Sequence, residues 1–163
     1  MKRKVSFQSV NINDAKVYSF DETLDPKLQG EAVAASASIP VAFKPTDTIG
    51  NYQLVDGGTY SDLNLQDAIE KCREITDDDH DIIVDVIMCQ TDPLVMEKYK
   101  SWDLFDAYHV QQREKSFKNY YASMNDVMTV ADANPNVTYR YVVTATETLP
   151  GGTIPIWVKP EDL

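Results

Sequence analysis

The sequence predicts an α/β protein in which a mixed or mainly parallel sheet is flanked by helices. Residues 82–89 form an almost continuous apolar, β-branched run, which is typical of a central strand covered on both faces. Before it, apolar side chains recur at helical spacing between residues 64 and 75, and Leu54 and Val55 form a short apolar stretch ahead of that helix. A strand, a helix and a second strand in this order predict a βαβ unit.

The composition predicts one globular domain spanning residues 1–163. That length buries about two thirds of the surface of an unfolded chain, and 43% of the residues are hydrophobic while 25% are charged. The net charge of -11 argues against a nucleic-acid partner and against strong attraction to anionic lipid. We expect a cytoplasmic or other intracellular location, with any membrane contact peripheral and largely apolar.

No targeting or membrane-spanning segment is predicted. The basic start at residues 1–4 is followed by alternating residues rather than by the apolar core of a signal peptide, and no apolar run is long enough to cross a bilayer. Cys72 and Cys89 lack metal-like spacing and fall in segments predicted to be buried, so we expect reduced thiols. Neither a metal nor another cofactor is expected.

The N-terminal third predicts two strands and one short helix. Val5, Phe7 and residues 17–20 follow extended patterns on either side of turn-forming residues 11–14, which indicates a hairpin. Residues 21–29 are polar and contain Pro26, so we expect a connection. Residues 30–38 predict a helix of small side chains, which Pro40 ends.

The predicted helix at 64–75 begins near Asp62 or Asn64, either of which could cap it. The acidic run 77–81 lacks the spacing and the glycine of a calcium loop, so a solvated loop is the better interpretation. Asp85 interrupts the strand that follows, and we interpret it as structural.

A long helical segment is predicted between Trp102 and Ala133, followed by strands. Its aromatic and methionine stripe is better explained as core than as a lipid-binding surface, and His109 is interpreted as an ordinary histidine. Residues 137–146 predict a strand, residues 149–152 a turn, and residues 154–158 an edge strand, because proline cannot donate to a sheet ladder. The stripe consists of Phe117, Tyr120, Tyr121, Met124 and Met128.

Asp56 is the predicted catalytic residue. It follows a short apolar stretch and precedes Gly57 and Gly58, an arrangement that can present a carboxylate at the end of a strand. Taken alone, the Asp-Gly-Gly motif favours an ordinary turn, because Asp and Gly dominate turns for local conformational reasons. The order of parts decides between these interpretations: A-A-S-A-S-I-P-V-A-F-K-P from Ala34, then L-V-D-G-G-T-Y-S-D-L-N-L-Q-D-A-I from Leu54.

These residues resemble the second half of the catalytic domain of patatin-like phospholipases, lipid acyl hydrolases with a Ser-Asp dyad. The resemblance extends from Glu31 to Ile69, and residues 5–21 fit the paired strands that precede this region in the family. It implies a partial patatin-like fold in which Asp56 is the general base of the dyad. The family nucleophile lies in a G-x-S-x-G elbow, and no such motif occurs in this sequence.

The resemblance therefore implies a nucleophile on another segment or another chain, with a lipid or ester as substrate. Ser36 and Ser38 are rejected as nucleophiles because they lie among alanines rather than between the glycines of an elbow. Three hypotheses remain. The chain is part of a serine esterase or phospholipase and is inactive alone, or it is a non-catalytic binding or structural protein that keeps half of the scaffold, or it is an unrelated α/β domain.

Overall fold

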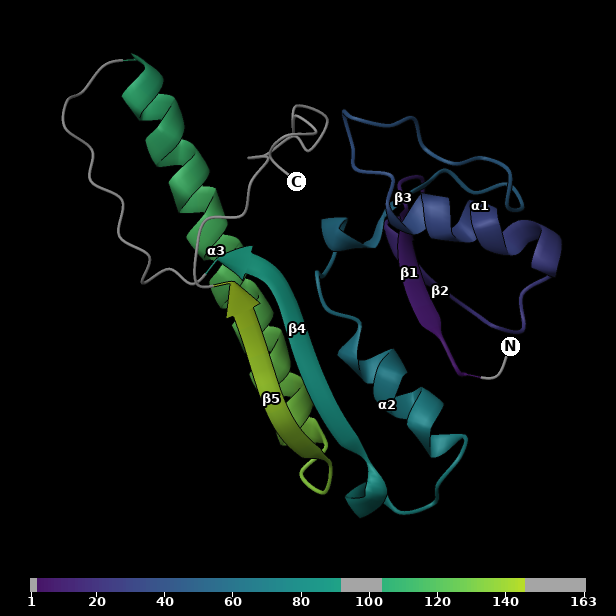
Figure 1. Ribbon diagram of the computed structural model, residues 1–163. Helices are drawn as coiled ribbons and strands as arrows, with labels where there is room; N and C mark the ends of the chain where they lie inside the picture. The colour runs from purple at the N-terminus through teal and green to yellow at the C-terminus, as the bar shows by residue number, and fades with distance from the viewer. Residues whose placement is uncertain (1–2, 92–103, 146–163) are drawn as a thin grey trace, which may run out of the picture.

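The structure is a computed structural model that describes residues 3–91 and 104–145 (Figure 1). It confirms the α/β class. The predicted single sheet is not found, because the described strands divide into one antiparallel and one parallel sheet. In chain order the elements are β1 (Ser6–Asn11), β2 (Lys16–Asp21), α1 (Pro26–Ser36), β3 (Leu54–Asp56), η1 (Gly57–Thr59), α2 (Leu65–Arg73), η2 (Asp79–Asp81), β4 (Ile83–Thr91), α3 (Leu104–Ala133) and β5 (Thr138–Ala145).

The N-terminal hairpin forms as predicted. Strands β1 and β2 pair antiparallel, with Ser6 opposite Asp21 and Val10 opposite Val17. The other edge of β1 pairs with β3, again antiparallel, with Val10 opposite Val55. Strand β1 is therefore the centre of the first sheet, and its position fixes that of the strand that ends in Asp56.

Helix α1 begins four residues before the predicted start. Pro26 occupies the first turn, where its missing N–H costs no hydrogen bond, and the side chain of Asp25 accepts the N–H of Lys27. The prediction of a connection through residue 29 was wrong because it treated Pro26 as a helix breaker. The small residues act as expected: Ala32 and Ala35 are fully buried, which lets α1 pack close to the sheet.

The parallel crossover differs from the predicted one. Strands β3 and β4 lie in different sheets, so the segment from β3 through α2 to β4 is not a βαβ unit within one sheet. Instead β4 and β5 pair in parallel and α3 connects them along the chain (Figure 1). A parallel pair needs a long crossover, which the 30 residues of α3 provide.

Strand β4 is covered on one face only by the described residues. Val84, Val86 and Met88 are buried, whereas Ile83 and Ile87 are 55% and 73% exposed. The prediction of a strand covered on both faces therefore does not hold for this part of the chain. The register shifts between Val84 and Asp85, and the guanidinium of Arg140 in β5 binds the carboxylate of Asp85, which holds the pKa of that carboxyl below its usual value.

Helix α2 lies between the two sheets and contacts both (Figure 1). Its Leu65 and Ile69 are buried in the larger core, against β4 and α3. On its other side, Asp67 accepts a hydrogen bond from the Ser6 hydroxyl of β1 at 2.9 Å. Lys71 binds Asp21 at the end of β2, with 2.7 Å between Nζ and Oδ2. One amphipathic helix therefore joins the two halves of the described chain.

The aromatic and methionine stripe of α3 is divided between core and solvent. Tyr120 and Met124 pack against the larger core, as predicted, whereas Tyr121 and Met128 are 60% and 63% exposed. None of the helices within the described ranges combines the length and apolar character that crossing a bilayer requires. The side chain of His109 and the predicted turn and edge strand after residue 145 lie outside the described residues.

The two cysteines and the acidic run 77–81 differ in how far they are exposed to solvent. Cys72 is half-buried, but Cys89 is exposed because it points to the uncovered side of β4, contrary to the expectation of burial. The run 77–81 is largely exposed, as expected of a solvated loop, and Asp79 binds Arg73 of α2. Across residues 3–91 and 104–145 no three potential ligands gather as a metal site would require.

Candidate active site

Asp56 is the last residue of β3, and its backbone is positioned by a segment on each side of that strand. It lies opposite Ser9 of β1. On the other edge, its N–H donates to the Ser38 carbonyl at 3.0 Å. The two stretches that carry the family resemblance, residues 34–45 and the Asp-Gly-Gly motif, therefore meet at this strand. The side chain of Asp56 is half-buried.

Gly57 and Gly58 are required for close approach rather than for an unusual backbone angle. Neither has a positive φ, so the backbone here does not use the left-handed conformations that glycine permits. A Cβ on Gly57 would lie 2.6 Å from the backbone carbonyl oxygen of Gln8. A Cβ on Gly58 would lie 2.9 Å from Asp62 Oδ1 and 3.1 Å from Asp56 Oδ1. Glycine thus lets η1 press against β1 and lets two carboxylates flank Gly58.

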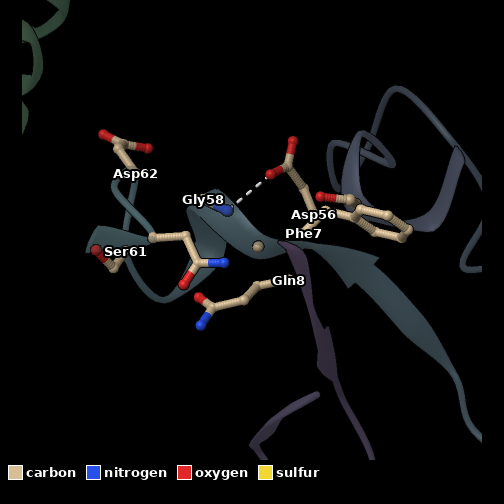
Figure 2. Close-up of a pocket in the computed structure, with 9 residues that line it drawn as sticks. Phe7, Gln8, Asp56, Gly58, Ser61 and Asp62 are labelled. Atoms are coloured by element: carbon tan, nitrogen blue, oxygen red, sulfur yellow. Dashed lines mark hydrogen bonds between the residues drawn. The ribbon is translucent and has the colours of Figure 1, made fainter. Parts of the chain in front are cut away.

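One oxygen of Asp56 is fixed and the other is open. The Gly58 N–H donates to Asp56 Oδ1 at 2.7 Å, which orients the carboxylate (Figure 2). In Figure 2 the other oxygen points away from Gly58, and it accepts no hydrogen bond from the described residues. The carboxylate is therefore preorganised but still has an acceptor position for an incoming proton donor.

A pocket of about 230 Å³ opens beside Asp56 (Figure 2). Residues from β1, α1 and the loop after β3 line it, so the fold brings together three segments that are far apart in sequence. No histidine is among the lining residues that the structure describes, and His80 lies instead in η2, where it contacts Asp78. The lining residues are Phe7, Gln8, Ser36, Asp56, Gly57, Gly58, Ser61, Asp62 and Asn64.

The two rejected serines occupy different positions. The hydroxyl of Ser38 donates to the Ala34 carbonyl at 2.8 Å and Ser38 is buried, which is a packing role. Ser36 lines the Asp56 pocket at the end of α1, but no hydrogen bond joins it to Asp56 in the structure. Neither hydroxyl therefore has a base positioned to take its proton.

A second pocket of about 460 Å³ adjoins the first, and sequence reasoning gave no indication of it. Gln8, Ser61 and Asn64 line both pockets, while Asp126 of α3 lines only the second. Ser61 Oγ donates to Asp126 Oδ2 at 2.7 Å. No local pattern marks Gln8, Ser61 or Asp126 as site residues, because the residues they contact are distant along the chain.

Comparison with models of known protein families, with curated proteins and with solved structures gives no match. The geometry of the Asp56 pocket is therefore the basis on which a function can be argued.

Proposed function

We propose that this chain is the C-terminal part of a patatin-like lipid acyl hydrolase and supplies the aspartate of a Ser-Asp dyad. Asp56 is the general base, and the nucleophilic serine lies on a segment outside these 163 residues or on a second chain. The observation that carries the proposal is the way in which the two oxygens of the Asp56 carboxylate are placed. One oxygen is held by the Gly58 N–H at 2.7 Å and the other is open beside a pocket.

The chemistry follows from that arrangement. A serine hydroxyl loses its proton as it attacks an ester carbonyl, and a base assists only from about 2.6–3.2 Å. The open oxygen of Asp56 would accept this proton and later return it to the leaving alkoxide. The Gly58 hydrogen bond keeps the carboxylate oriented through both steps. An aspartate is an ordinary weak base in water, so the serine-bearing segment must also shield Asp56 from solvent.

The proposal gives the chain a defined partner and substrate class. The partner carries a G-x-S-x-G elbow and the oxyanion donors, and it covers the Asp56 pocket. The substrate is a lipid or another carboxylic ester. With a net charge of -11, attraction to an anionic membrane is unfavourable, so any membrane contact is peripheral and apolar.

A second candidate function is that of a non-catalytic binding or structural protein built on half of the patatin scaffold. The observation that favours it is the apolar side of the parallel sheet. Ile83, Ile87, Tyr141 and Val143 are each at least 50% exposed there. Parallel sheets are normally covered on both faces, so such a surface favours association. Light scattering after size-exclusion chromatography tests this candidate, because a strictly monomeric chain without bound protein would contradict it.

The deciding experiment labels the active serine. The tagged chain is purified under native conditions with its bound proteins and treated with a fluorophosphonate probe, and the labelled peptide is sequenced. We expect a serine within G-x-S-x-G on another polypeptide. Asp56→Asn should slow the labelling of this serine by about a hundredfold or more. The same proteins should still co-purify with the variant chain.

The matched control is Asp77→Asn, the same substitution at an exposed carboxylate in the acidic loop. It should leave the labelling rate unchanged. Full labelling of the Asp56→Asn complex would show that Asp56 is only a turn residue.

A further inference from the structure

One face of the β4–β5 sheet is apolar and is left uncovered by the described residues. Helices α2 and α3 pack against the other face, with α3 behind the strands in Figure 1. Within residues 83–89, every second side chain is exposed and those between are buried. In β5, Tyr141 lies opposite Asp85 and Val143 lies opposite Ile87, so these two point to the same side. We call this surface the outer face, and it consists of Ile83, Asp85, Ile87, Cys89, Tyr141 and Val143.

The charges on the outer face balance. Asp85 lies between Ile83 and Ile87, and its carboxylate binds the guanidinium of Arg140, with 2.9 Å between Nε and Oδ1. Cζ of Arg140 also lies 5.3 Å from the centre of the Tyr141 ring. Asp85 and Arg140 are the only charged residues in the two strands. This surface is therefore neutral, although the whole chain has a net charge of -11.

An ion pair among the apolar side chains argues against lipid as the partner of this surface. In hydrocarbon both charges would lose water without gaining hydrogen bonds, and attraction within the pair does not fully offset that loss. The bonds to Asp85 use two N–H groups of Arg140, which leaves further donors on the guanidinium and further lone pairs on the carboxylate. A suitable partner therefore presents apolar side chains around one donor and one acceptor.

A second copy of the outer face has this chemistry. In a two-fold dimer the same surface meets itself, so that Asp85 of each chain faces Arg140 of the other. The two ion pairs would lie head to tail, and apolar side chains would fill the space between two sheets about 10 Å apart. From the balanced ion pair and its apolar surroundings, we propose that the chain forms a two-fold dimer through the outer face.

This dimer goes beyond the proposed dyad and does not depend on it, because Asp56 lies in the antiparallel sheet. It commits to one partner for the apolar surface on which the second candidate function rests. The net charge of -11 opposes the approach of two chains. At about 0.15 M salt the Debye length is about 8 Å, so charges outside the outer face are largely screened. We therefore expect the dimer at physiological rather than at very low ionic strength.

The test reverses one charge of the pair at a time in the full chain. Asp85→Arg leaves only positive groups on the outer face, and Arg140→Asp leaves only negative ones. Sedimentation equilibrium up to about 100 μM should show a dimer for the unaltered chain. Either variant alone should dissociate with a constant at least about tenfold higher, and an equimolar mixture of the two should form a heterodimer. A monomeric unaltered chain would overturn the proposal, as would a mixture that associates no better than each variant alone.

Two isoleucines give a matched test that leaves the ion pair intact. Ile87 and Ile75 are 73% and 74% exposed, but only Ile87 belongs to the outer face. Ile87→Lys should raise the dissociation constant at least about tenfold because it buries an unpaired charge, whereas Ile75→Lys should leave it unchanged. Circular dichroism checks that each variant is folded, and this pair decides if a charge-reversal variant is not. Equal dissociation constants for the two lysine variants would contradict the dimer.

The thiol of Cys89 reports what covers the outer face, because it is exposed in the single chain. Its labelling by a maleimide, followed by peptide mass spectrometry, should slow as the protein concentration rises through the dissociation constant. Protection that is the same at every concentration would show that another part of the same chain covers the face. A monomeric chain whose binding to phosphatidylcholine vesicles or to a co-purified protein is lost in Ile87→Lys would identify a different partner. Each of these results overturns the proposal.

The outcome is separate from that of the proposed function. If the mixed variants form a heterodimer but Asp56→Asn leaves serine labelling unchanged, the dimer stands and Asp56 is not the base. If Asp56→Asn slows labelling while the unaltered chain does not self-associate, the dyad proposal stands and the dimer is overturned.

Discussion

Ser61 and Asp126, 65 residues apart, are joined by a 2.7 Å hydrogen bond between a hydroxyl and a carboxylate. Ser61 belongs to the loop that follows Asp56, and Asp126 belongs to α3. Helix α3 in turn contributes Val127 to the core beneath β4. The bond thus connects the catalytic candidate in the antiparallel sheet to the framework of the parallel sheet.

This connection predicts an energetic coupling between the two side chains. In a double-mutant cycle, Ser61→Ala and Asp126→Ala should show a coupling free energy of about 1 kcal/mol, because a partly buried hydrogen bond to a carboxylate is lost in either single variant. Urea unfolding of the four proteins measures it. As a control, the changes in the free energy of unfolding caused by Asp132→Ala and Ser61→Ala should add within about 0.5 kcal/mol. If the changes caused by Asp126→Ala and Ser61→Ala also add within that limit, the expected coupling is absent.

Two glycines should respond in opposite directions to the same substitution. Gly57→Ala forces a Cβ within 2.6 Å of a backbone oxygen, so we expect a loss of about 1–3 kcal/mol in the free energy of unfolding. Gly30→Ala lies in exposed helix with no atom within 4 Å of the new Cβ. It should stabilise by about 0.5–1 kcal/mol. Chemical denaturation measures both, and a neutral Gly57→Ala would mean that η1 does not press against β1.

The isolated chain should not hydrolyse short p-nitrophenyl esters above background. Ser36 reaches the Asp56 pocket without a hydrogen bond to the carboxylate, and Ser38 donates to a backbone carbonyl. Neither is therefore an activated nucleophile. Release of p-nitrophenolate measures the activity. Hydrolysis that disappears in Ser36→Ala or Ser38→Ala would place the nucleophile in this chain.

Stability in acid should depend on Glu22. The backbone N–H of Val5 donates to its carboxylate at 3.1 Å, and Lys4 adds an ion pair, so the pKa of Glu22 is lowered to about 2. A lowered pKa in the folded state gives stability that is complete above the ordinary value of 4.5 and is lost as the pH falls toward about 2.

Glu22→Gln should remove this contribution, so that stability falls less steeply across that range. The urea midpoint measured at several pH values shows the slope. Identical slopes for the two proteins would indicate that the Val5 and Lys4 contacts do not persist in solution.

Local patterns in the sequence were sufficient for several elements. Alternation around turn residues predicted the β1–β2 hairpin, and the apolar period predicted α2, because both signals depend on neighbours within a few residues. Asp56 was chosen differently, from the order of motifs between Glu31 and Ile69 that resembles patatin-like phospholipases, and its catalytic role stays a prediction. Reasoning from local patterns failed at Pro26, because proline is compatible both with the end of a helix and with its first turn.

Long-range contacts decided the rest. Which strand pairs with which is set by hydrogen bonds between distant segments, so the sequence alone could not place β3 beside β1 or β4 beside β5. The reason that Gly57 must be glycine is the carbonyl of Gln8 on another strand. Ser61 and Asp126 line the second pocket together although 65 residues separate them, a contact that no local propensity encodes and that tertiary packing alone creates.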